Sequence, residues 1–390
     1  MYALTHALIH TGQQTLQDHA LLIDGEQMVG ITPQHTLDAG IRQINLAGAH
    51  LAPGFIDLQL NGCGGVMFNQ SPTVETLERM HACNLGSGTT SFLPTFITAD
   101  WEQVRLAIAA TAAYRQQYSH SVLGLHLEGP FINPARKGIH PAARIQPLDA
   151  ARVDELCQHA GTIAKITLAP EQVTPAHIAR LHEAGILVAI GHSAASYDQA
   201  MAGFAAGIRF ATHLYNAMTP TLNGREPGVV GAIYDAAISD SHSVSAGIIA
   251  DGYHVHWANV RLAKRILGER LCLVTDGTAA SGAPEGFAEF DFCGARILIK
   301  NGRCEDEAGT LGGSSLTMLQ GVANLVSKAG VPLPEALRMA STYPARVLGL
   351  NHSVGAIAPG MVANLVIFDE QWQQRGIVMN GKYCPASVQK

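Results

Sequence analysis

The chain has 390 residues, of which 47% are hydrophobic and 14% charged, so it can bury a large core and exceed one domain. Its 31 acidic and 25 basic residues give a net charge of -6 without a Lys/Arg cluster, which argues against a nucleic-acid or membrane partner. The N-terminus has no signal-peptide pattern, and the seven scattered Cys residues include no Cys-x-x-Cys pair, so we expect a cytoplasmic protein without a disulfide framework.

Short strands are predicted at both ends of the chain. Residues 20–31 form a hairpin pattern around Asp24-Gly25, and strand patterns return at 364–379 before an Asn380-Gly381 turn. Neither piece is large enough to be stable alone. We therefore predict that residues 1–52 and 350–390 form one small discontinuous β-sandwich domain.

Between these pieces, apolar runs of strand length alternate with helical stretches, the pattern of βα units around a parallel sheet. Eight such runs predict an α/β fold, a (β/α)8 TIM barrel over residues 53–349, with its active site at the strand C-terminal ends. The predicted strands are 54–60, 90–96, 122–127, 163–169, 186–190, 209–213, 244–250 and 271–275. Predicted helices include 74–85, 101–118, 150–159, 175–184 and 260–267.

The stretch after the eighth strand, residues 279–313, is too long for an ordinary βα loop. Its apolar pieces at 290–292 and 296–299 predict an extra hairpin beside the barrel. Two helices, 315–329 with Ser314 as cap and 334–348, are then predicted to close the barrel.

Four predicted strands end in a residue that can carry chemistry: Glu128, His192, His213 and Asp276. One carboxylate and two imidazoles are the ligand types of a catalytic zinc site with an open position, and Asp276 could then serve as the base. Taken singly, each residue has a plainer interpretation. A strand-end His can bond a loop carbonyl, Glu128 can pair with an Arg, and Asp276 can cap a turn. Convergence at one barrel mouth favours the metal site.

Longer motifs occur in order along the whole chain. They are Pro-Gly-Phe-Ile-Asp-Leu-Gln-Leu-Asn-Gly-Cys-Gly-Gly (53–65), His-Leu-Glu-Gly-Pro (126–130), Lys-Gly-Ile-His (137–140), Gly-His-Ser (191–193), Ala-Thr-His-Leu-Tyr-Asn-Ala-Met (211–218), Gly-Arg-Glu-Pro-Gly (224–228), Ala-Asp-Gly-Tyr-His (250–254), Thr-Asp-Gly-Thr-Ala (275–279) and Gly-Thr-Leu-Gly-Gly-Ser-Ser (309–315). With these motifs the sequence resembles the amidohydrolase superfamily and, within it, the N-acetylglucosamine-6-phosphate deacetylase family.

The resemblance implies a role for each matching residue. It implies metal ligands at Glu128, His192 and His213, a catalytic acid at Asp276, and a catalytic His140 that helps hold the oxyanion. The implied substrate contacts are Ile139, His140, Asn216, Ala217, Arg225, Asp251, Gly252, Tyr253, His254, Leu311, Gly312 and Gly313. Arg225 and His254 would meet the sugar phosphate. Their plainer interpretations are an ion pair of Arg225 with Glu226 or a neighbouring acid, and a solvated loop position for His254.

One motif departs from the wider superfamily, because Gln59-Leu60-Asn61 stands where a second metal is usually held by His-x-His. Amides are weaker ligands than imidazoles, so we expect one divalent metal per subunit, zinc first, with iron, manganese or cobalt as alternatives.

The implied reaction is hydrolysis of the acetamide of N-acetylglucosamine 6-phosphate in amino-sugar catabolism and cell-wall sugar recycling. Alternatives are the N-acetylgalactosamine 6-phosphate reaction and a non-catalytic scaffold. The resemblance also implies a homodimer with phosphate contacts from the neighbouring subunit.

Overall fold

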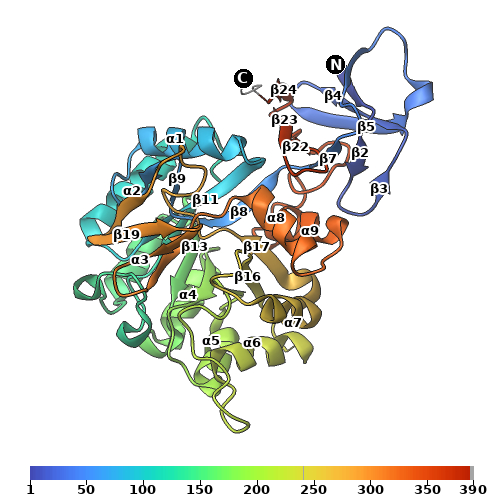
Figure 1. Cartoon of the computed structure of the whole chain (residues 1–390). Coiled ribbons are helices and arrows are strands. Elements are labelled where there is room, and N and C mark those ends of the chain that lie inside the picture. The colour runs from blue at the N-terminus through green and yellow to red at the C-terminus, as the bar shows by residue number, and fades with distance from the viewer. Residues whose placement is uncertain (240, 387–390) are drawn as a thin grey trace.

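A computed structural model describes residues 1–239 and 241–386. Its central element is an eight-stranded parallel sheet with the strand order β17-β16-β15-β14-β13-β12-β11-β8. A parallel bridge between Leu60 and Gly277 joins the first strand to the segment after the last, which closes the predicted barrel (Figure 1). The strands are β8 (Phe55–Leu60), β11 (Thr89–Ile97), β12 (Leu125–Glu128), β13 (Ile163–Leu168), β14 (Leu187–Ile190), β15 (Phe210–Ala211), β16 (Ser245–Ile249) and β17 (Leu271–Val274).

The helices between the strands pack around the outside of the barrel (Figure 1). Several begin at polar caps, as when the Thr73 hydroxyl accepts from Thr76 N in α1 and Ser196 and Gln199 form a capping box in α5. All the helices predicted between strands are confirmed. Their bounds are α1 (Val74–Leu85), α2 (Trp101–Arg115), α3 (Ala150–Gln158), α4 (Pro175–Glu183), α5 (Tyr197–Ala206), α6 (Gly228–Ile238) and α7 (Trp257–Leu267).

The two closing helices differ from the prediction. Helix α8 (Met318–Ser327) is capped by Thr317, because Ser314 lies in a strand and its hydroxyl donates to Thr275 O at 2.7 Å. The predicted helix 334–348 is two helices, α9 (Leu333–Ala340) and α10 (Thr342–Val347). Pro344 explains the break, since it lacks an N–H and its ring clashes with the carbonyl four residues earlier in a continuous helix.

The long stretch after β17 contains the predicted hairpin, extended to a four-stranded antiparallel sheet. Its buried side chains, Phe292 and Ile297 among them, cluster with Met67 of strand β10 (Val66–Met67) and with Ile97, the last residue of β11. The sheet therefore covers one side of the carboxyl ends of the barrel strands. Its strands are β18 (Glu289–Phe292), β19 (Ala295–Lys300), β20 (Arg303–Glu305) and β21 (Leu311–Ser314).

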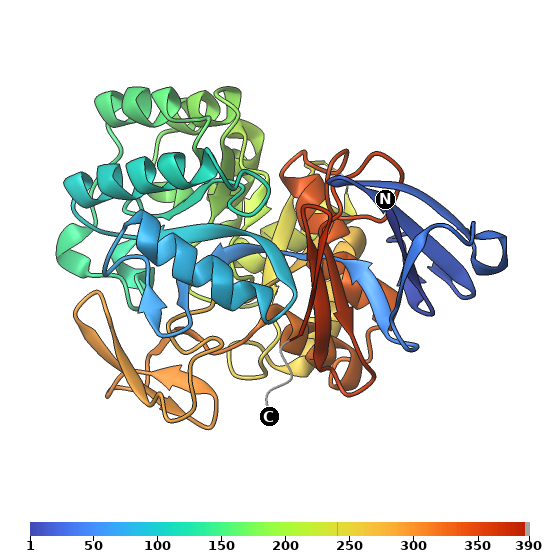
Figure 2. The ribbon, with the colours of Figure 1, turned by 90° about the horizontal axis from the view of Figure 1, so that it is seen from above.

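The two ends of the chain meet in a β-rich domain on one side of the barrel (Figure 2). One sheet has the order β5-β4-β1-β6, and the other, β24-β23-β22-β7-β2-β3, contains strands from both ends. Buried Leu4, Leu51 and Leu365 share its core. This confirms the β-rich domain, while its limits at 52/53 and 349/350 stay predictions. The strands are β1 (Tyr2–Thr5), β2 (Leu8–His10), β3 (Thr15–Leu16), β4 (His19–Asp24), β5 (Gln27–Pro33), β6 (Arg42–Asn45), β7 (His50–Pro53), β22 (Leu365–Phe368), β23 (Gln374–Met379) and β24 (Lys382–Pro385).

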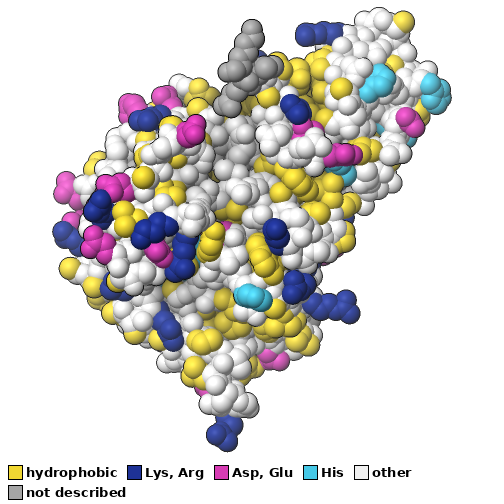
Figure 3. Space-filling view, in the orientation of Figure 1, with side chains coloured by type: hydrophobic (Ala, Val, Ile, Leu, Met, Phe, Trp, Pro, Cys, Tyr) yellow, Lys and Arg dark blue, Asp and Glu magenta, His cyan; other side chains and the backbone are white. Residues whose placement is uncertain are grey.

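Two further observations concern the helices and the surface. Within residues 1–239 and 241–386, no helix combines the length and apolar character needed to cross a membrane. Figure 3 shows Lys/Arg and Asp/Glu side chains interspersed over the visible face.

Candidate active site

A cavity of about 340 Å³ opens at the carboxyl ends of the barrel strands. It brings together residues that the sequence places up to 252 positions apart, as between Asn61 and Gly313. The predicted site residues that line it are Glu128, Ile139, His140, His192, His213, Asn216, Ala217, His254, Asp276, Leu311 and Gly313. The predicted residues outside its lining are Arg225, Asp251, Gly252, Tyr253 and Gly312.

The three predicted metal ligands converge. Oε1 of Glu128 lies 3.3 Å from Nε2 of His192 and 3.0 Å from Nε2 of His213. The two Nε2 atoms are 3.1 Å apart, and all three side chains are buried. These atoms form a triangle at the carboxyl ends of β12, β14 and β15. The three side chains point into the barrel mouth.

The backbone at these strand ends is unusual. His192, His213 and Asp276 have φ values of 48°, 34° and 51°, in the left-handed region that residues other than glycine rarely adopt. Such conformations cost about 1–3 kcal/mol and cluster at functional sites. The left-handed backbone makes a sharp turn at the end of each strand. This turn directs the side chain at that position into the barrel.

The donor set fits a divalent cation. Nδ1 of His192 lies 2.9 Å from the carbonyl of Arg136, which only accepts, so Nδ1 carries the hydrogen and the lone pair of Nε2 is left for a cation. Ligands of a tetrahedral zinc with bonds of ~2.0–2.1 Å lie roughly 3.3 Å apart. The observed triangle has nearly this size.

The same triangle attracts protons when it holds no cation. Burial alone would raise the pKa of Glu128, but the contacts with His192 and His213 hold it well below the usual value. Burial lowers the pKa of His192, yet the Glu128 carboxylate raises it overall. The carboxylate therefore stays ionised and needs positive charge beside it.

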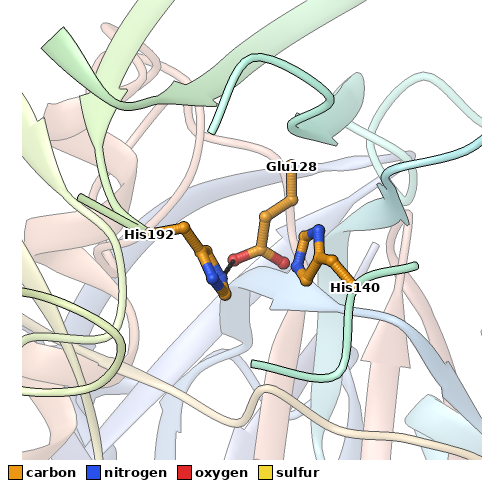
Figure 4. A group of neighbouring side chains, drawn as sticks. All are labelled: Glu128, His140 and His192. Atoms are coloured by element: carbon orange, nitrogen blue, oxygen red, sulfur yellow. Dashed lines mark ion pairs between the residues drawn. The ribbon is translucent and has the colours of Figure 1, made fainter. Parts of the chain in front are cut away.

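His140 offers an alternative third ligand. Its ligand atom and those of Glu128 and His192 lie within 4.8 Å of one another, and Figure 4 shows the carboxylate between the two rings. Nδ1 of His140 is, however, 2.8 Å from the Thr98 hydroxyl, whereas His213 contacts the carboxylate at 3.0 Å. Burial also keeps the pKa of His140 well below its usual value, so this ring is neutral. We favour His213 as the ligand and His140 as a neighbour.

Asp276 is held by the two amides of the Gln-Leu-Asn motif. Nδ2 of Asn61 donates to Oδ1 of Asp276 at 2.7 Å, and Nε2 of Gln59 donates to the same oxygen at 3.0 Å. Nε2 of Gln59 also lies 3.1 Å from Oε1 of Glu128. The carboxylate thus bonds side-chain amides instead of capping a turn.

The surroundings of Asp276 suit proton transfer. Burial and then the nearby charge of Glu128 raise its pKa, while His213 and Asn61 oppose the shift. A carboxyl group whose pKa is moved toward neutrality can take up and return a proton during a reaction.

The opposite wall of the cavity carries His254. Its Nδ1 lies 2.6 Å from Oδ2 of Asp251, and its side chain is only 5% exposed, so the solvated-loop interpretation is wrong. Backbone N–H groups of Tyr253 and His254 donate to the other oxygen of Asp251. Asp251 therefore orients the imidazole and leaves its second nitrogen for a ligand in the cavity.

Arg225 lies on the loop between β15 and α6, which projects at the lower edge of the molecule in Figure 1. The ion pair with Glu226 is wrong, because Oε1 of Glu226 instead accepts from the backbone N–H groups of Tyr197 and Gly228. Within the described ranges, the Arg225 guanidinium makes no ion pair. Arg225 also does not line the cavity of its own subunit. A basic side chain stands at the lower tip in Figure 3.

The remaining predicted residues outside the cavity support its walls. The Tyr253 hydroxyl donates to Asn301 O at 2.5 Å, and a Cβ at Gly312 would meet Ile297 at 2.7 Å, so a side chain there would displace the inserted sheet.

The sequence analysis did not predict several of the residues that line the cavity. They are Ile97, Ala135, Arg136, Gly138, Phe292 and Thr310.

Comparisons with known proteins show what this chain is similar to. The Amidohydrolase family model matches residues 50–387, and the NagA composite domain model matches residues 1–51. The N-acetylglucosamine-6-phosphate deacetylase of Haemophilus influenzae is 45% identical, over 98% of this chain and 99% of that protein. The N-acetylgalactosamine-6-phosphate deacetylase of a Shewanella strain is 36% identical, over 86% of this chain and 84% of that protein.

A solved structure is similar along the whole chain. The crystal structure of N-acetylglucosamine-6-phosphate deacetylase from Pasteurella multocida superposes with a TM-score of 0.95 at 43% identity, covering 98% of this chain and 99% of that one. The fold agrees with these matches. This chain therefore belongs to the amidohydrolase family, and within it to the group of the N-acetylated amino-sugar phosphate deacetylases.

Proposed function

We propose that this chain hydrolyses the acetamide of N-acetylglucosamine 6-phosphate to glucosamine 6-phosphate and acetate, in amino-sugar catabolism and cell-wall sugar recycling. The observation that carries the proposal is the triangle of Glu128, His192 and His213 beside Asp276 in one cavity. The 45% identity to a relative of that name over 98% of the chain supports the choice of substrate.

The triangle would hold one divalent metal per subunit, with zinc as first choice because two imidazoles and one carboxylate suit it. When bound, the ion would supply a Lewis acid that polarises the amide carbonyl and activates water. Gln59 and Asn61 donate their N–H groups to Glu128 and Asp276. Amides are weaker ligands than imidazoles, so we assign these two residues to positioning the carboxylates and expect a single metal.

The chain's own residues supply the proton transfers. Asp276 accepts a proton from the attacking water, and then delivers it to the nitrogen as the C–N bond breaks and glucosamine 6-phosphate leaves. His140 donates to the oxyanion that develops on the carbonyl, since burial would penalise that charge without a partner. Asn61 and Gln59 hold the carboxylate in place throughout.

The phosphate would bind at the far side of the cavity. His254, oriented by Asp251, and the backbone of residues 311–313 face it from the same subunit, and Ile139, Asn216 and Ala217 line the space for the sugar. We assign Arg225 to the phosphate of a neighbouring subunit in a homodimer. Its exposed loop position and its lack of an ion pair in the described ranges support this assignment.

The principal alternative is deacetylation of N-acetylgalactosamine 6-phosphate, which would use the same catalytic residues. The 36% identity to a Shewanella enzyme of that name keeps this candidate open. A non-catalytic scaffold is disfavoured, because a scaffold has no need to maintain left-handed backbone at His192, His213 and Asp276.

The testing experiment follows acetate release by the metal-loaded protein from both sugar phosphates under identical conditions. The proposal expects kcat/KM to be higher for the gluco substrate. A higher value for the galacto substrate would assign the alternative, and no acetate from either substrate would remove the enzymatic function.

A further inference from the structure

A further cavity, which we call the floor cavity, opens at the amino ends of the barrel strands. It has a volume of about 440 Å³. Its lining includes Leu187, the first residue of β14, and Arg209, which directly precedes β15. The catalytic cavity lies at the carboxyl ends of the same strands and shares no lining residue with it within the described ranges. The two cavities are therefore separate sites.

Three basic side chains line the floor cavity. They are Arg115, His182 and Arg209, and the described residues of its lining include no Asp or Glu. A Cβ at Gly207 would lie 2.7 Å from Cβ of His182, so His182 packs on the turn that leads into Arg209. Burial and then the charge of Arg209 lower the pKa of His182, while Glu183 opposes this shift from outside the lining. The cavity wall is thus positive and lacks a carboxylate of its own.

Arg209 caps backbone carbonyls with only one of its nitrogens. Its Nη1 donates to Phe204 O at 2.7 Å and to Ile208 O at 2.9 Å, which uses both hydrogens of that nitrogen. Within residues 1–239 and 241–386, no hydrogen bond or ion pair uses its Nε or Nη2. These two nitrogens form an edge of the guanidinium that can bind two oxygens of one anion.

Arg115 is half-buried and forms no ion pair with a carboxylate of the described residues. Its Nε donates to Val122 O at 3.1 Å and its Nη1 donates to Gly161 O, but its Nη2 makes no hydrogen bond within the same ranges. Burial lowers the pKa of this guanidinium. Carbonyl capping explains why Arg115 is present, but it leaves a partly buried positive charge that an anion would stabilise.

The rest of the wall is largely aliphatic. Leu123 and Ile186 are buried, whereas Leu187, Val347 and Leu350 are partly exposed. A volume of about 440 Å³ lies within the range of small-molecule sites, ~300–1,000 Å³. The wall therefore suits a small molecule that has an anionic group for the guanidiniums and an apolar part for the aliphatic side chains.

We propose that the floor cavity binds a phosphate monoester with a small apolar body. The phosphate accepts a bidentate pair from Nε and Nη2 of Arg209 and single hydrogen bonds from Nη2 of Arg115 and from the imidazole of His182. A phosphate monoester carries a charge of about -1.5 to -2 and three acceptor oxygens, so it satisfies these donors better than a carboxylate does. No step of the proposed deacetylase reaction uses this site.

The test measures the Kd of phenyl phosphate for the full-length, metal-loaded protein by isothermal titration calorimetry. Benzoate serves as the carboxylate probe and inorganic phosphate as the probe without an apolar body, and phenyl phosphate should bind more tightly than either. Arg209→Lys should raise its Kd about 10-fold or more, because the ammonium keeps the charge and loses the bidentate edge. His182→Ala should raise it about 2- to 10-fold, the value of one hydrogen bond.

Two further variants locate the binding. Arg79→Ala removes an exposed arginine from α1 that lines neither cavity and should leave the Kd unchanged. Phenyl phosphate bound in the catalytic cavity would instead respond to His254→Ala and not to the floor substitutions. Since the His182 side chain is exposed, His182→Ala should fold, and it decides alone if Arg209→Lys is recovered unfolded.

Three outcomes would overturn the proposal. One is a Kd for phenyl phosphate that neither Arg209→Lys nor His182→Ala changes, and another is an equal loss of affinity in Arg79→Ala. Benzoate or inorganic phosphate that binds as tightly as phenyl phosphate would reject the assigned ligand class. Because the titration follows binding and not acetate release, its result is independent of the proposed deacetylase function.

Discussion

The side-chain nitrogen of Asn61 lies 2.7 Å from Oδ1 of Asp276. This bond stabilises the ionised carboxylate and fixes its direction, and the residue that makes it belongs to the Gln59-Leu60-Asn61 motif. The Gln-Leu-Asn motif therefore supports the proton acceptor.

Replacing Asn61 tests this support. Asn61→Ala should lower kcat about 10- to 150-fold, because a hydrogen bond to a charged group is worth roughly 1.5–3 kcal/mol. The bond lowers the pKa of Asp276, so its loss should raise that pKa and move the acidic limb of the pH–rate profile to higher pH. Asn45→Ala, which removes an amide in the β-rich domain, is the control. An acidic limb at the same pH in both variants would contradict the role of Asn61.

Asp276→Asn should retain the metal and lose nearly all turnover. The amide keeps the shape of the carboxylate and cannot accept the water proton, and general acid–base groups contribute ~10²- to 10⁴-fold. Metal content and acetate release are measured on the same preparation. Near-wild-type turnover with bound metal would exclude Asp276 from the proton transfers.

Arg225→Ala should reduce kcat/KM for the phosphorylated sugar about 10- to 150-fold, the value of a charge-assisted pair, and hardly change that for N-acetylglucosamine. Only the phosphorylated sugar offers the guanidinium a partner. Both substrates are compared in wild type and variant. Equal proportional losses would instead mean that Arg225 supports the loop.

Whether Arg225 serves the site of the neighbouring subunit can be tested by mixing two impaired variants. A heterodimer of Arg225→Ala and Asp276→Asn contains one site with both residues intact if Arg225 serves its neighbour. Random mixing should then recover activity approaching about a quarter of the wild-type value, since half the dimers carry one intact site. If Arg225 serves its own subunit, no site is restored and mixing recovers nothing.

The barrel and the strand-end residues could be predicted because both depend on local signals. Each buried strand is a short apolar run, and Glu128, His192, His213 and Asp276 follow such runs directly. The helix break at Pro344 was also visible locally, but the apolar period around it favoured one continuous helix.

The missed features depend on contacts between distant segments. Phe292 and Thr310 reach the cavity from the inserted sheet, whose position over the barrel mouth has no signal in the strand pattern. Arg136 flanks the Lys-Gly-Ile-His motif and could have been suspected.

The central claim is that Glu128, His192 and His213 hold the metal while His140 acts on the substrate, and metal analysis of two variants tests it most directly. Since two protein ligands seldom hold a divalent ion against a chelator, His213→Ala should lose metal and activity together. His140→Ala should keep one metal per chain and lose turnover only. A His140→Ala protein without metal, beside a His213→Ala protein that binds as tightly as wild type, would contradict this assignment and identify His140 as the third ligand.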